Sequence, residues 1–305
     1  MEYIRRALAA RRVATGHGAD SARAESLWMV AHVMRRSFDD ILADPAQPVS
    51  AAAGSRLEHL LSRRLGERRP LAYLLREAWL GPHRFYVDER AIVPRSFIAG
   101  WLLEQGRPWV ASPQRVGRVL DLCTGSGCLA ILAALAFPRA EVDAVDISRG
   151  ALAVARRNVR DYKLEARVRL VAGDLFEPLA RRRYDLVLAN PPYVTRRAMH
   201  GLPPEYRAEP ALALEGGVDG LDVVRRILEG SAAHLRKGGM LILEVGRGRR
   251  RVERRYPQLA LTWIEDSAAR GMVLAAHASD LAACFSAARA AVPGAAVPRR
   301  HGTGR

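Results

Sequence analysis

The chain has 305 residues, 49% of them hydrophobic, and carries a formal net charge of +16. This length predicts two domains, and the composition excludes an intrinsically disordered chain because enough apolar residues are present for a buried core in each domain. No run of about 18 apolar residues occurs, and the segment from Met1 to Arg6 contains no apolar signal-peptide core, so we expect a cytoplasmic protein without a membrane partner.

Residues 1–78 predict a small bundle of amphipathic helices. Apolar side chains recur at helical spacing in two stretches, at Leu27, Val30, Ala31 and Met34 and again at Leu57, Leu60, Leu61 and Leu65. Nothing in this segment suggests catalysis. We therefore assign it to recognition of the substrate.

Residues 79–96 predict a β-hairpin that links the two domains. The segment from Phe85 to Pro94 contains two short β-like runs around the charged turn Asp88-Glu89-Arg90. Arg95 and Ser96 follow the proline, where the chain passes into the second domain. This position is typical of an ordinary linker and equally of a cleft, and we take Arg95 as a candidate substrate-binding residue.

Strand-like runs alternate with helical segments in residues 97–286. Strands are expected near residues 118–123, 141–146, 167–172, 184–189 and 240–245, and the runs 259–265 and 272–276 predict a closing antiparallel pair. The alternation predicts an α/β fold with a doubly wound, mostly parallel, Rossmann-like sheet. Ligands of such sheets bind at the carboxyl ends of the strands. Four polar residues fall at such ends: Asp121, Asp146, Asp174 and Asn190.

A glycine-rich turn follows the first of these strands. Thr124-Gly125-Ser126-Gly127 precedes an apolar helix that begins at Cys128. Glycines allow a ligand to approach the backbone closely, and the helix N-terminus offers free N–H groups to an anion. Asp146, at the end of the next strand, can accept both hydroxyls of a ribose. We therefore expect a nucleoside-containing cofactor, and we assign Asp174 and Leu175 to the same site.

Two cofactors fit this pattern. Gly125, Gly127 and Ala130 satisfy the dinucleotide fingerprint G-x-G-x-x-G/A. Asp121, which can face an ammonium group, and the later Asn-Pro-Pro-Tyr segment instead favour S-adenosylmethionine, because hydride transfer has no use for that segment. We expect S-adenosylmethionine.

Asn190-Pro191-Pro192-Tyr193 predicts a receptor for a planar NH2 group. The two prolines have no backbone N–H, and a residue that precedes a proline is restricted to extended conformations. The segment is therefore rich in acceptors. The Asn190 side-chain oxygen and the Pro191 carbonyl can each take one N–H, with Tyr193 against the flat face of the group. A structural turn is the alternative interpretation.

The last part of the chain is basic and contains the third cysteine. An arginine cluster comprises Arg247, Arg249, Arg250, Arg251, Arg254 and Arg255. It can be interpreted as an RNA-facing patch, as a solvated helix face, or as the result of a coding bias toward arginine. Residues 287–305 predict a disordered basic tail. The three cysteines are Cys123, Cys128 and Cys284. They form neither an even disulfide set nor a Cys-x-x-Cys spacing, and we expect no metal site.

Together these motifs resemble the HemK/PrmB protein-glutamine methyltransferases over roughly residues 70–275. The resemblance is carried by the segments Asp121–Cys128, Asp174–Phe176, Asn190–Tyr193, Glu209–Leu221 and Glu244–Gly246, with Asp146. It implies a class I methyltransferase that binds S-adenosylmethionine through Asp121, residues 124–128, Asp146, Asp174, Leu175 and Asn190. It also implies methyl transfer to the amide nitrogen of a glutamine, with Asn190, Pro191 and Tyr193 as catalytic residues.

Within this family the chain is most similar to the PrmB branch, whose members modify the large-subunit ribosomal protein uL3. The similar segments are Ala78–Leu80, Phe85–Arg90 and Val93–Ser96. In place of Val93–Ser96, the sister branch that modifies release factors typically has Ile-Pro-Arg-Pro. The chain departs from the branch at Phe97, at Gly100 and in residues 265–271, which lack a usual Phe-Asp pairing. These departures leave the donor motif and the Asn-Pro-Pro-Tyr segment intact.

The resemblance implies uL3 or its assembly intermediate as the substrate, with a contact to rRNA through the arginine-rich surface. One alternative is methylation of a release-factor glutamine. Another is methylation of adenine N6 or guanine N2 in nucleic acid, because an exocyclic amine presents the same two N–H groups. A third is a non-catalytic ribosome-binding protein that retains the fold.

Overall fold

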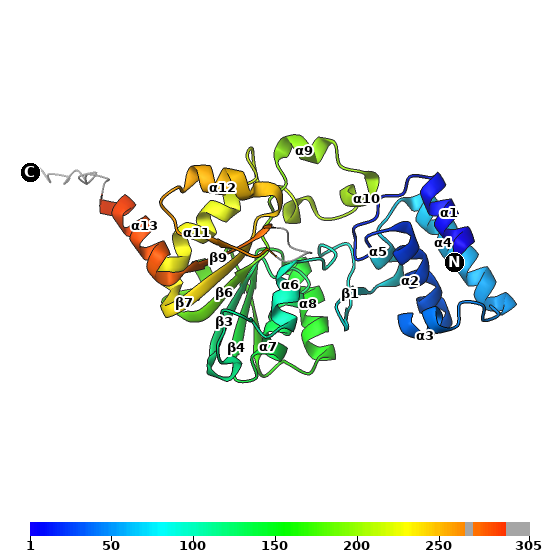
Figure 1. The fold of residues 1–305 in the computed structure, drawn as a ribbon, viewed down its shortest axis with the longest axis horizontal. Coiled ribbons are helices and arrows are strands. Elements are labelled where there is room, and N and C mark those ends of the chain that lie inside the picture. The colour runs from blue at the N-terminus through cyan, green and yellow to red at the C-terminus, as the bar shows by residue number, and fades with distance from the viewer. Residues whose placement is uncertain (266–270, 291–305) are drawn as a thin grey trace, which may run out of the picture.

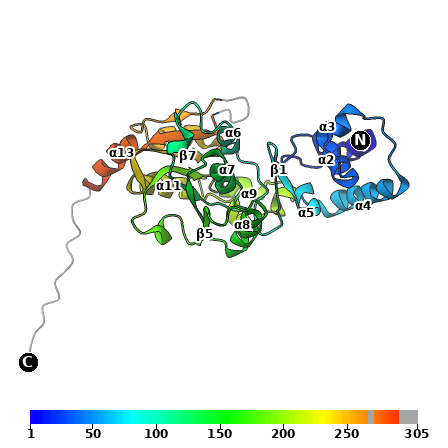
Figure 2. The ribbon, with the colours of Figure 1, turned by 90° about the horizontal axis from the view of Figure 1, so that it is seen from below.

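The computed structural model describes residues 1–265 and 271–290. A group of helices lies at the N-terminal end of the molecule, and an α/β part forms the rest (Figures 1 and 2). The last described helix, α13 (Ala278–Ala290), lies at the end opposite to the N terminus.

Five helices build the N-terminal part, which confirms the expected helical bundle. They are α1 (Glu2–Ala10), α2 (Ala22–Met34), α3 (Phe38–Ala43), α4 (Ala51–Glu67) and α5 (Leu71–Leu75). Ser21, Ser37 and Ser50 cap three of them, because each hydroxyl accepts a hydrogen bond from a backbone N–H in the first turn. Their apolar faces meet in one core around Trp28 and Met29.

A β-hairpin follows, but it does not lie where we predicted it. Strands β1 (Ala78–Leu80) and β2 (His83–Phe85) pair antiparallel, and Gly81 in the turn between them has a φ of +55°. Gly81-Pro82 is a strong turn signal. The hairpin predicted between Phe85 and Pro94 is therefore wrong in position, because Asp88 folds that segment locally by accepting hydrogen bonds from the backbone and guanidinium of Arg90.

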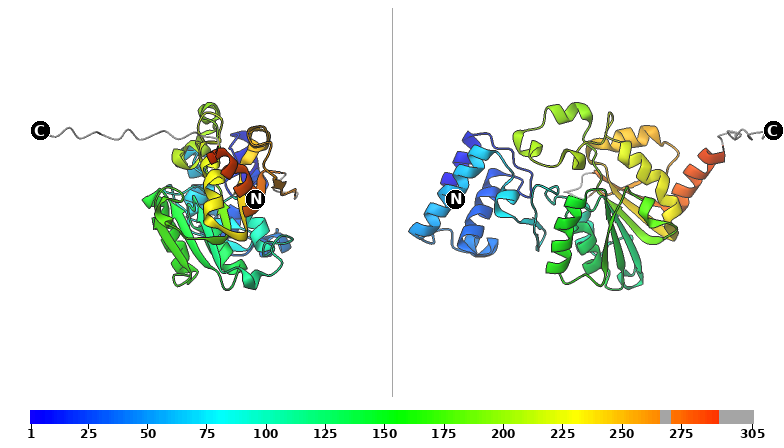
Figure 3. Two further views of the ribbon diagram at one scale, coloured as in Figure 1. Left: turned by 90° about the vertical axis from the view of Figure 1, so that its left-hand side faces the viewer. Right: turned by 180° about the vertical axis from the view of Figure 1, so that it is seen from behind.

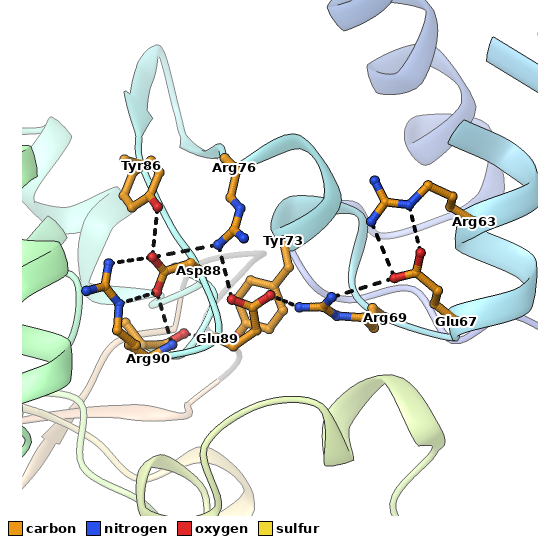
Figure 4. Close-up of polar contacts among 10 residues, drawn as sticks. Arg63, Glu67, Arg69, Tyr73, Arg76, Tyr86, Asp88, Glu89 and Arg90 are labelled. Atoms are coloured by element: carbon orange, nitrogen blue, oxygen red, sulfur yellow. Dashed lines mark hydrogen bonds and ion pairs between the residues drawn. The ribbon is translucent and has the colours of Figure 1, made fainter. Parts of the chain in front are cut away.

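Polar contacts hold this linker against helices α4 and α5 (Figure 4). Glu89 pairs with Arg69, and the Arg76 guanidinium lies 3.1 Å from the Glu89 carboxylate. The Tyr73 hydroxyl donates a 2.7 Å hydrogen bond to the backbone carbonyl of Ala91. The linker is thus fixed to the N-terminal helices at Glu89 and Ala91.

Seven strands form the main sheet, in the order β5-β4-β3-β6-β7-β9-β8. The strands are β3 (Arg118–Leu122), β4 (Glu141–Asp146), β5 (Val168–Ala172), β6 (Tyr184–Ala189), β7 (Leu235–Glu244), β8 (Thr262–Trp263) and β9 (Val273–His277). Strands β3 to β7 run parallel, and β9 pairs antiparallel with both β7 and β8. This confirms the predicted, mostly parallel sheet with an antiparallel end pair.

Strands β3 and β6 form the switch point of the sheet. The chain passes from β3 to β4 and β5 and then returns to β6 on the other side of β3. Leu122 lies opposite Val145 and opposite Ala189, and Ala189 lies opposite Leu243. The residues that follow these strands therefore meet at one edge, where ligands of such sheets bind.

Helices cover both faces of the sheet (Figure 3). One face packs against α6 (Ile98–Leu103), α7 (Cys128–Ala136) and α8 (Arg149–Asp161), and the other against α11 (Asp222–His234), α12 (Arg249–Arg255) and α13. Because both faces are covered, the central strands β3 and β6 are mostly apolar and buried. Short 3-10 turns complete the fold: η1 (Pro113–Arg115), η2 (Glu177–Leu179), η3 (Ala211–Ala213) and η4 (Gly246–Gly248).

A long excursion after β6 reaches the N-terminal helices. It contains α9 (Arg196–His200) and α10 (Pro204–Arg207), and α10 lies next to the N-terminal bundle in Figure 1. Glu205 of α10 is fully buried and pairs with Arg64 of α4 and with Arg68, which follows that helix. No local sequence pattern indicates this anchor, because it joins residues far apart in the chain.

The C-terminal helix corrects one prediction. Because α13 extends to Ala290, residues 287–290 of the predicted disordered tail are helical. The remainder of that tail, residues 291–305, and residues 266–270 of the unusual 265–271 segment lie outside the described residues. In the ranges that the structure describes, no helix has the length and apolar character needed to cross a bilayer.

Candidate functional site

Two cavities adjoin at the carboxyl edge of the sheet. The large cavity has a volume of about 890 Å³ and lies between the N-terminal helices and the sheet edge. The small cavity has a volume of about 200 Å³ and lies over the ends of β3, β4 and β5. Four residues line both cavities: Ile92, Cys123, Asn190 and Ala213.

The glycine turn after β3 contributes to the small cavity. Gly125 and Gly127 have φ values of +56° and +79°, in the left-handed region that favours glycine. A Cβ at Gly127 would lie 3.0 Å from the Cβ of Ala155, so this glycine allows the turn to pack against α8. Gly125 instead lines the small cavity.

Asp146 is held at the small cavity by backbone hydrogen bonds. Its carboxylate accepts an N–H from Gly125 and another from Ser148, each at 2.8 Å. Burial raises the pKa of Asp146 above its ordinary value, although these two hydrogen bonds act in the opposite direction. Each carboxylate oxygen has a further lone pair. The group can therefore accept additional hydrogen bonds, as the hydroxyls of a ribose would require.

The Asn-Pro-Pro-Tyr segment lies where the two cavities meet. Asn190 is half-buried and lines both, Pro191 lines the large cavity, and Pro192 lines the small one. The chain after the motif is fixed by a bridge between Val194 and Glu215. The segment is thus held by β6 on one side and by this bridge on the other.

Tyr193 lines the large cavity in a fixed orientation. Its hydroxyl donates a 2.9 Å hydrogen bond to Glu244. A Cβ at Gly246 would lie 2.5 Å from the Tyr193 ring, so the ring packs directly on this glycine. Burial raises the pKa of Tyr193, and the hydroxyl therefore stays protonated as a donor.

Arg95 lines the large cavity, but its guanidinium is engaged by a carboxylate. It donates to both oxygens of Glu209, at 2.5 and 2.7 Å, and Glu209 also accepts the backbone N–H of Val93 at 2.9 Å. Burial acts to raise the pKa of Glu209, but the His17 imidazole 3.4 Å away and the Arg95 guanidinium hold it at about 2. Glu209 is therefore ionised, and Arg95 is held in place by it.

Asp121 is not at a cavity wall. It is fully buried, and one carboxylate oxygen accepts a hydrogen bond from the Thr124 hydroxyl. The other oxygen, Oδ1, has no hydrogen-bond partner in the described part of the chain. Burial raises the pKa of Asp121 to about 7, and the negative charge of Asp146 adds to this shift. Asp121 thus supports Thr124, which does line the large cavity.

The structure brings most of the predicted site residues to the two cavities. Those that line the large cavity are Arg95, Thr124, Ser126, Cys128, Asn190, Pro191 and Tyr193. Those that line the small cavity are Gly125, Asp146, Asp174, Leu175, Asn190 and Pro192. Asp121 and Gly127 lie behind the walls.

Sequence reasoning missed several apolar residues of the walls. Ile147 and Leu212 line the small cavity and are 56% and 60% exposed. Ile92 and Cys123 line both cavities. Ile147 could have been found, because it directly follows Asp146 at the strand end. Ile92 lies in the linker and Leu212 in the 3-10 turn η3, and only the tertiary fold brings these segments to the sheet edge.

The small cavity has side chains that could hold a nucleoside. The exposed apolar side chains of Ile147 and Leu212 can cover a flat ring, and Asp146 can accept ribose hydroxyls. Thr124, at the glycine turn, lies on the large-cavity side, toward Asn190. No group of histidine, cysteine or acidic side chains suited to a metal ion occurs among the residues that the structure describes.

Two family models match the chain. The model described as PrmC N-terminal domain matches residues 7–75, and the model described as Methyltransferase small domain matches residues 110–202.

Curated relatives match nearly the whole chain. The ribosomal protein uL3 glutamine methyltransferase of Bordetella pertussis is 49% identical over 274 residues, which are 90% of this chain and 92% of that protein. The protein of the same name from Bradyrhizobium diazoefficiens is 49% identical over 277 residues, covering 88% of this chain and 86% of that protein. That of Neisseria gonorrhoeae is 45% identical over 258 residues, covering 85% and 86%.

Solved structures of methyltransferases are also similar. A methyltransferase from Pyrococcus furiosus has a TM-score of 0.48 at 16% identity, covering 74% of this chain and 98% of that one. The ribosomal protein L11 methylase of Lactobacillus delbrueckii subsp. bulgaricus has a TM-score of 0.41 at 17% identity, covering 59% and 76%.

Proposed function

Because this chain belongs to the ribosomal protein uL3 glutamine methyltransferase family, we propose that it transfers a methyl group from S-adenosylmethionine to the side-chain amide nitrogen of a glutamine in uL3. The observation that supports this most is the position of Asn190 at the junction of two cavities. The small cavity suits the adenosyl group. The large cavity suits the protein segment that carries the glutamine.

The reaction requires the substrate nitrogen to be held in one orientation. An amide nitrogen is a weak nucleophile because its lone pair is delocalised, a resonance reflected in a rotation barrier of about 18–20 kcal/mol. In this proposal the Asn190 Oδ1 and the Pro191 carbonyl each accept one N–H of the glutamine. The lone pair then points out of the amide plane toward the small cavity. Such positioning can lower a barrier by about 7–11 kcal/mol.

Tyr193 completes the receptor from the large-cavity side. We propose that its ring lies against the flat face of the glutamine amide, and its contact with Gly246 holds the ring in place. When bound, S-adenosylmethionine supplies an electrophilic methyl group on a positively charged sulfur. An aromatic face contributes about 0.5–2 kcal/mol to a nearby cation. The methylated nitrogen carries a positive charge and releases its N–H proton readily to water, so no dedicated base is required.

The large cavity is the proposed substrate channel. Its walls include Gly16 and Asp20 of the N-terminal part as well as Tyr193 and Leu214 of the α/β part. We therefore propose that residues 1–78 recognise the substrate, that residues 79–96 link the two parts, and that residues 97–286 bind the donor. Arg95 belongs to the substrate-facing wall in this division.

We also propose that the arginine-rich surface contacts rRNA when uL3 is offered as an assembly intermediate. Helix α12 and the turn before it carry four exposed arginines: Arg247, Arg250, Arg254 and Arg255. Such a cluster attracts a polyanion, and the attraction weakens as salt concentration rises.

The test is a methylation assay with purified uL3 and labelled S-adenosylmethionine, followed by mass spectrometry of the product. We expect a mass increase of one CH2 on a glutamine with wild type and none with Asn190→Ala. Calorimetry with S-adenosylhomocysteine is the control, and Asn190→Ala should bind it within about threefold of wild type. An active Asn190→Ala variant would contradict the receptor role.

The same assay separates the alternatives. A release factor and duplex DNA are offered in parallel, and methylation of either one in preference to uL3 would overturn the substrate assignment. uL3 is offered both free and bound to rRNA. A faster rate on the bound form that declines with added salt supports the RNA contact, and equal rates argue against it.

A further inference from the structure

Glu244 ends β7 beside the acceptor motif, and its side chain has no part in the mechanism described above. The residue is 1% exposed. Because Ala189 lies opposite Leu243 in the parallel pair, Glu244 at the end of β7 lies at the level of Asn190, the residue that follows β6. Burial raises the pKa of Glu244, while hydrogen bonds to its carboxylate act in the opposite direction.

Three donors from two segments converge on this carboxylate. Oε1 accepts the Tyr193 hydroxyl at 2.9 Å. Oε2 accepts the Ser96 hydroxyl at 2.7 Å and the Phe97 backbone N–H at 3.0 Å. One carboxylate thus joins the acceptor motif to the end of the interdomain linker.

The linker end that Glu244 holds is a wall of the large cavity. Residues 92–97 all line that cavity. Upstream, the linker is tied to α4 and α5 by the polar contacts in Figure 4. In the middle, Glu209 binds the Val93 N–H and the Arg95 guanidinium. Glu244 supplies the downstream anchor, and it is the anchor that also contacts the motif itself.

We propose that Glu244 is a positioning residue that sets the orientation of the Tyr193 ring and the distance between Tyr193 and the linker wall. The inference rests on the proposed function, since Tyr193 is the acceptor-side residue through which Glu244 acts. A glutamine at this position has only one carbonyl oxygen. If the NH2 group faces Tyr193, the tyrosine hydroxyl must accept this hydrogen bond instead of donating it. If the NH2 group faces the linker, it meets the Phe97 N–H, which cannot accept a hydrogen bond.

The test measures kcat, KM for uL3 and donor affinity in Glu244→Gln, Tyr193→Phe and the double variant. We expect Glu244→Gln to lower kcat by about 10- to 100-fold, as small misplacements of reacting groups do. Donor affinity should stay within about threefold, and KM should change less than kcat. If Glu244 acts through the Tyr193 hydroxyl, the double variant should be no slower than the slower single variant.

Asp143→Asn is the matched control. The Asp143 carboxylate is also buried and accepts a tyrosine hydroxyl, that of Tyr184 at 2.7 Å, but it lines neither cavity. Asp143→Asn should lower thermal stability, as Glu244→Gln does, and leave kcat within about twofold of the wild-type value. Equal loss of kcat in both variants, or wild-type kcat in Glu244→Gln, overturns the proposal.

A structural measurement keeps this test independent of the assigned substrate. If wild type fails to methylate uL3, the proposed function fails, and the positioning role is judged from crystal structures of wild type and Glu244→Gln with S-adenosylhomocysteine bound. A displaced Tyr193 ring or a displaced 94–97 segment supports the role. Unchanged positions of both overturn it.

Discussion

Asp121 shows how the direction of a side chain decides the role of a carboxylate. The sequence places it near a strand end, where it was expected to face the ammonium group of the donor. The strand ends at Leu122, and side chains alternate along it, so Asp121 points away from the face that buries Leu120 and Leu122. It lies under Thr124 instead. Its place near a strand end marks Asp121 as a candidate, but the glycine turn after the strand, and not Asp121, forms the cavity wall.

The buried Asp121 predicts a pH dependence of stability. Its pKa is about 7 in the folded chain because of burial, whereas an unfolded aspartate titrates near about 3.9. Between these values the folded state binds more protons than the unfolded state. The free energy of unfolding therefore falls as pH rises through this window, by up to about 1.4 kcal/mol per pH unit. Asp121→Asn should remove this contribution.

Urea unfolding at pH 5, 6, 7 and 8 tests this prediction. The difference in unfolding free energy, Asp121→Asn minus wild type, should rise from pH 5 to about pH 7 and then level off. Other titrating groups are common to both proteins and cancel in the difference. A difference that stays constant across this range would show that Asp121 is already ionised at pH 5.

At the scale of the element, Asp146 connects strand β4 to the glycine turn. Asp146→Ala removes the proposed ribose acceptor and the hydrogen bond that orients Gly125. We expect the affinity for S-adenosylhomocysteine to fall by about 10- to 100-fold, equivalent to about 1.4–2.7 kcal/mol. Isothermal titration calorimetry measures this loss.

Asp185→Ala is the control for the loss of backbone hydrogen bonds. The Asp185 carboxylate also accepts two backbone N–H groups, those of Gly117 and Arg118 at 2.8 Å, but at the amino-terminal edge of the sheet. Asp185→Ala should reduce the free energy of unfolding while leaving the affinity for S-adenosylhomocysteine unchanged. Equal affinities for Asp146→Ala and wild type would mean that the ribose is held elsewhere.

The elements differ in how far the sequence could predict them. Four of the five parallel strands are predicted to within one residue at each end, whereas β7 begins five residues earlier than expected. Strands β3, β4 and β6 are the most predictable because most of their residues are buried. The linker hairpin was misplaced because Phe85 to Pro94 has β-forming residues, while Asp88 closes a local turn there. The glycine turn and Asn190 were found from local motifs. Ile92 and Leu212 could not be predicted, because no local pattern marks a residue of a connecting segment that folding brings to a cavity wall.

At the scale of the whole molecule, buried charge joins the two parts of the chain. Arg64 is 1% exposed and binds Glu25 within the N-terminal part and Glu205 from the excursion after β6. This contact cannot be predicted from the sequence, because no local pattern distinguishes a buried arginine from the many exposed ones. The large cavity lies between the parts that this contact holds together.

Glu205→Ala should therefore loosen the two parts from each other. The substitution leaves Arg64 buried with Glu25 as its remaining carboxylate partner. Because this partner remains, we expect the free energy of unfolding to fall by about 2–4 kcal/mol, toward the lower end of the cost of breaking a buried pair. Because the substrate channel spans both parts, KM for uL3 should rise while affinity for S-adenosylhomocysteine stays within about threefold. Glu67→Ala removes two solvent-accessible pairs, with Arg63 on the same helix α4 and with Arg69, and should change none of these quantities measurably. Denaturant unfolding, calorimetry and uL3 methylation kinetics on the three proteins decide the matter, and an unchanged KM in Glu205→Ala would show that the excursion is positioned without its anchor.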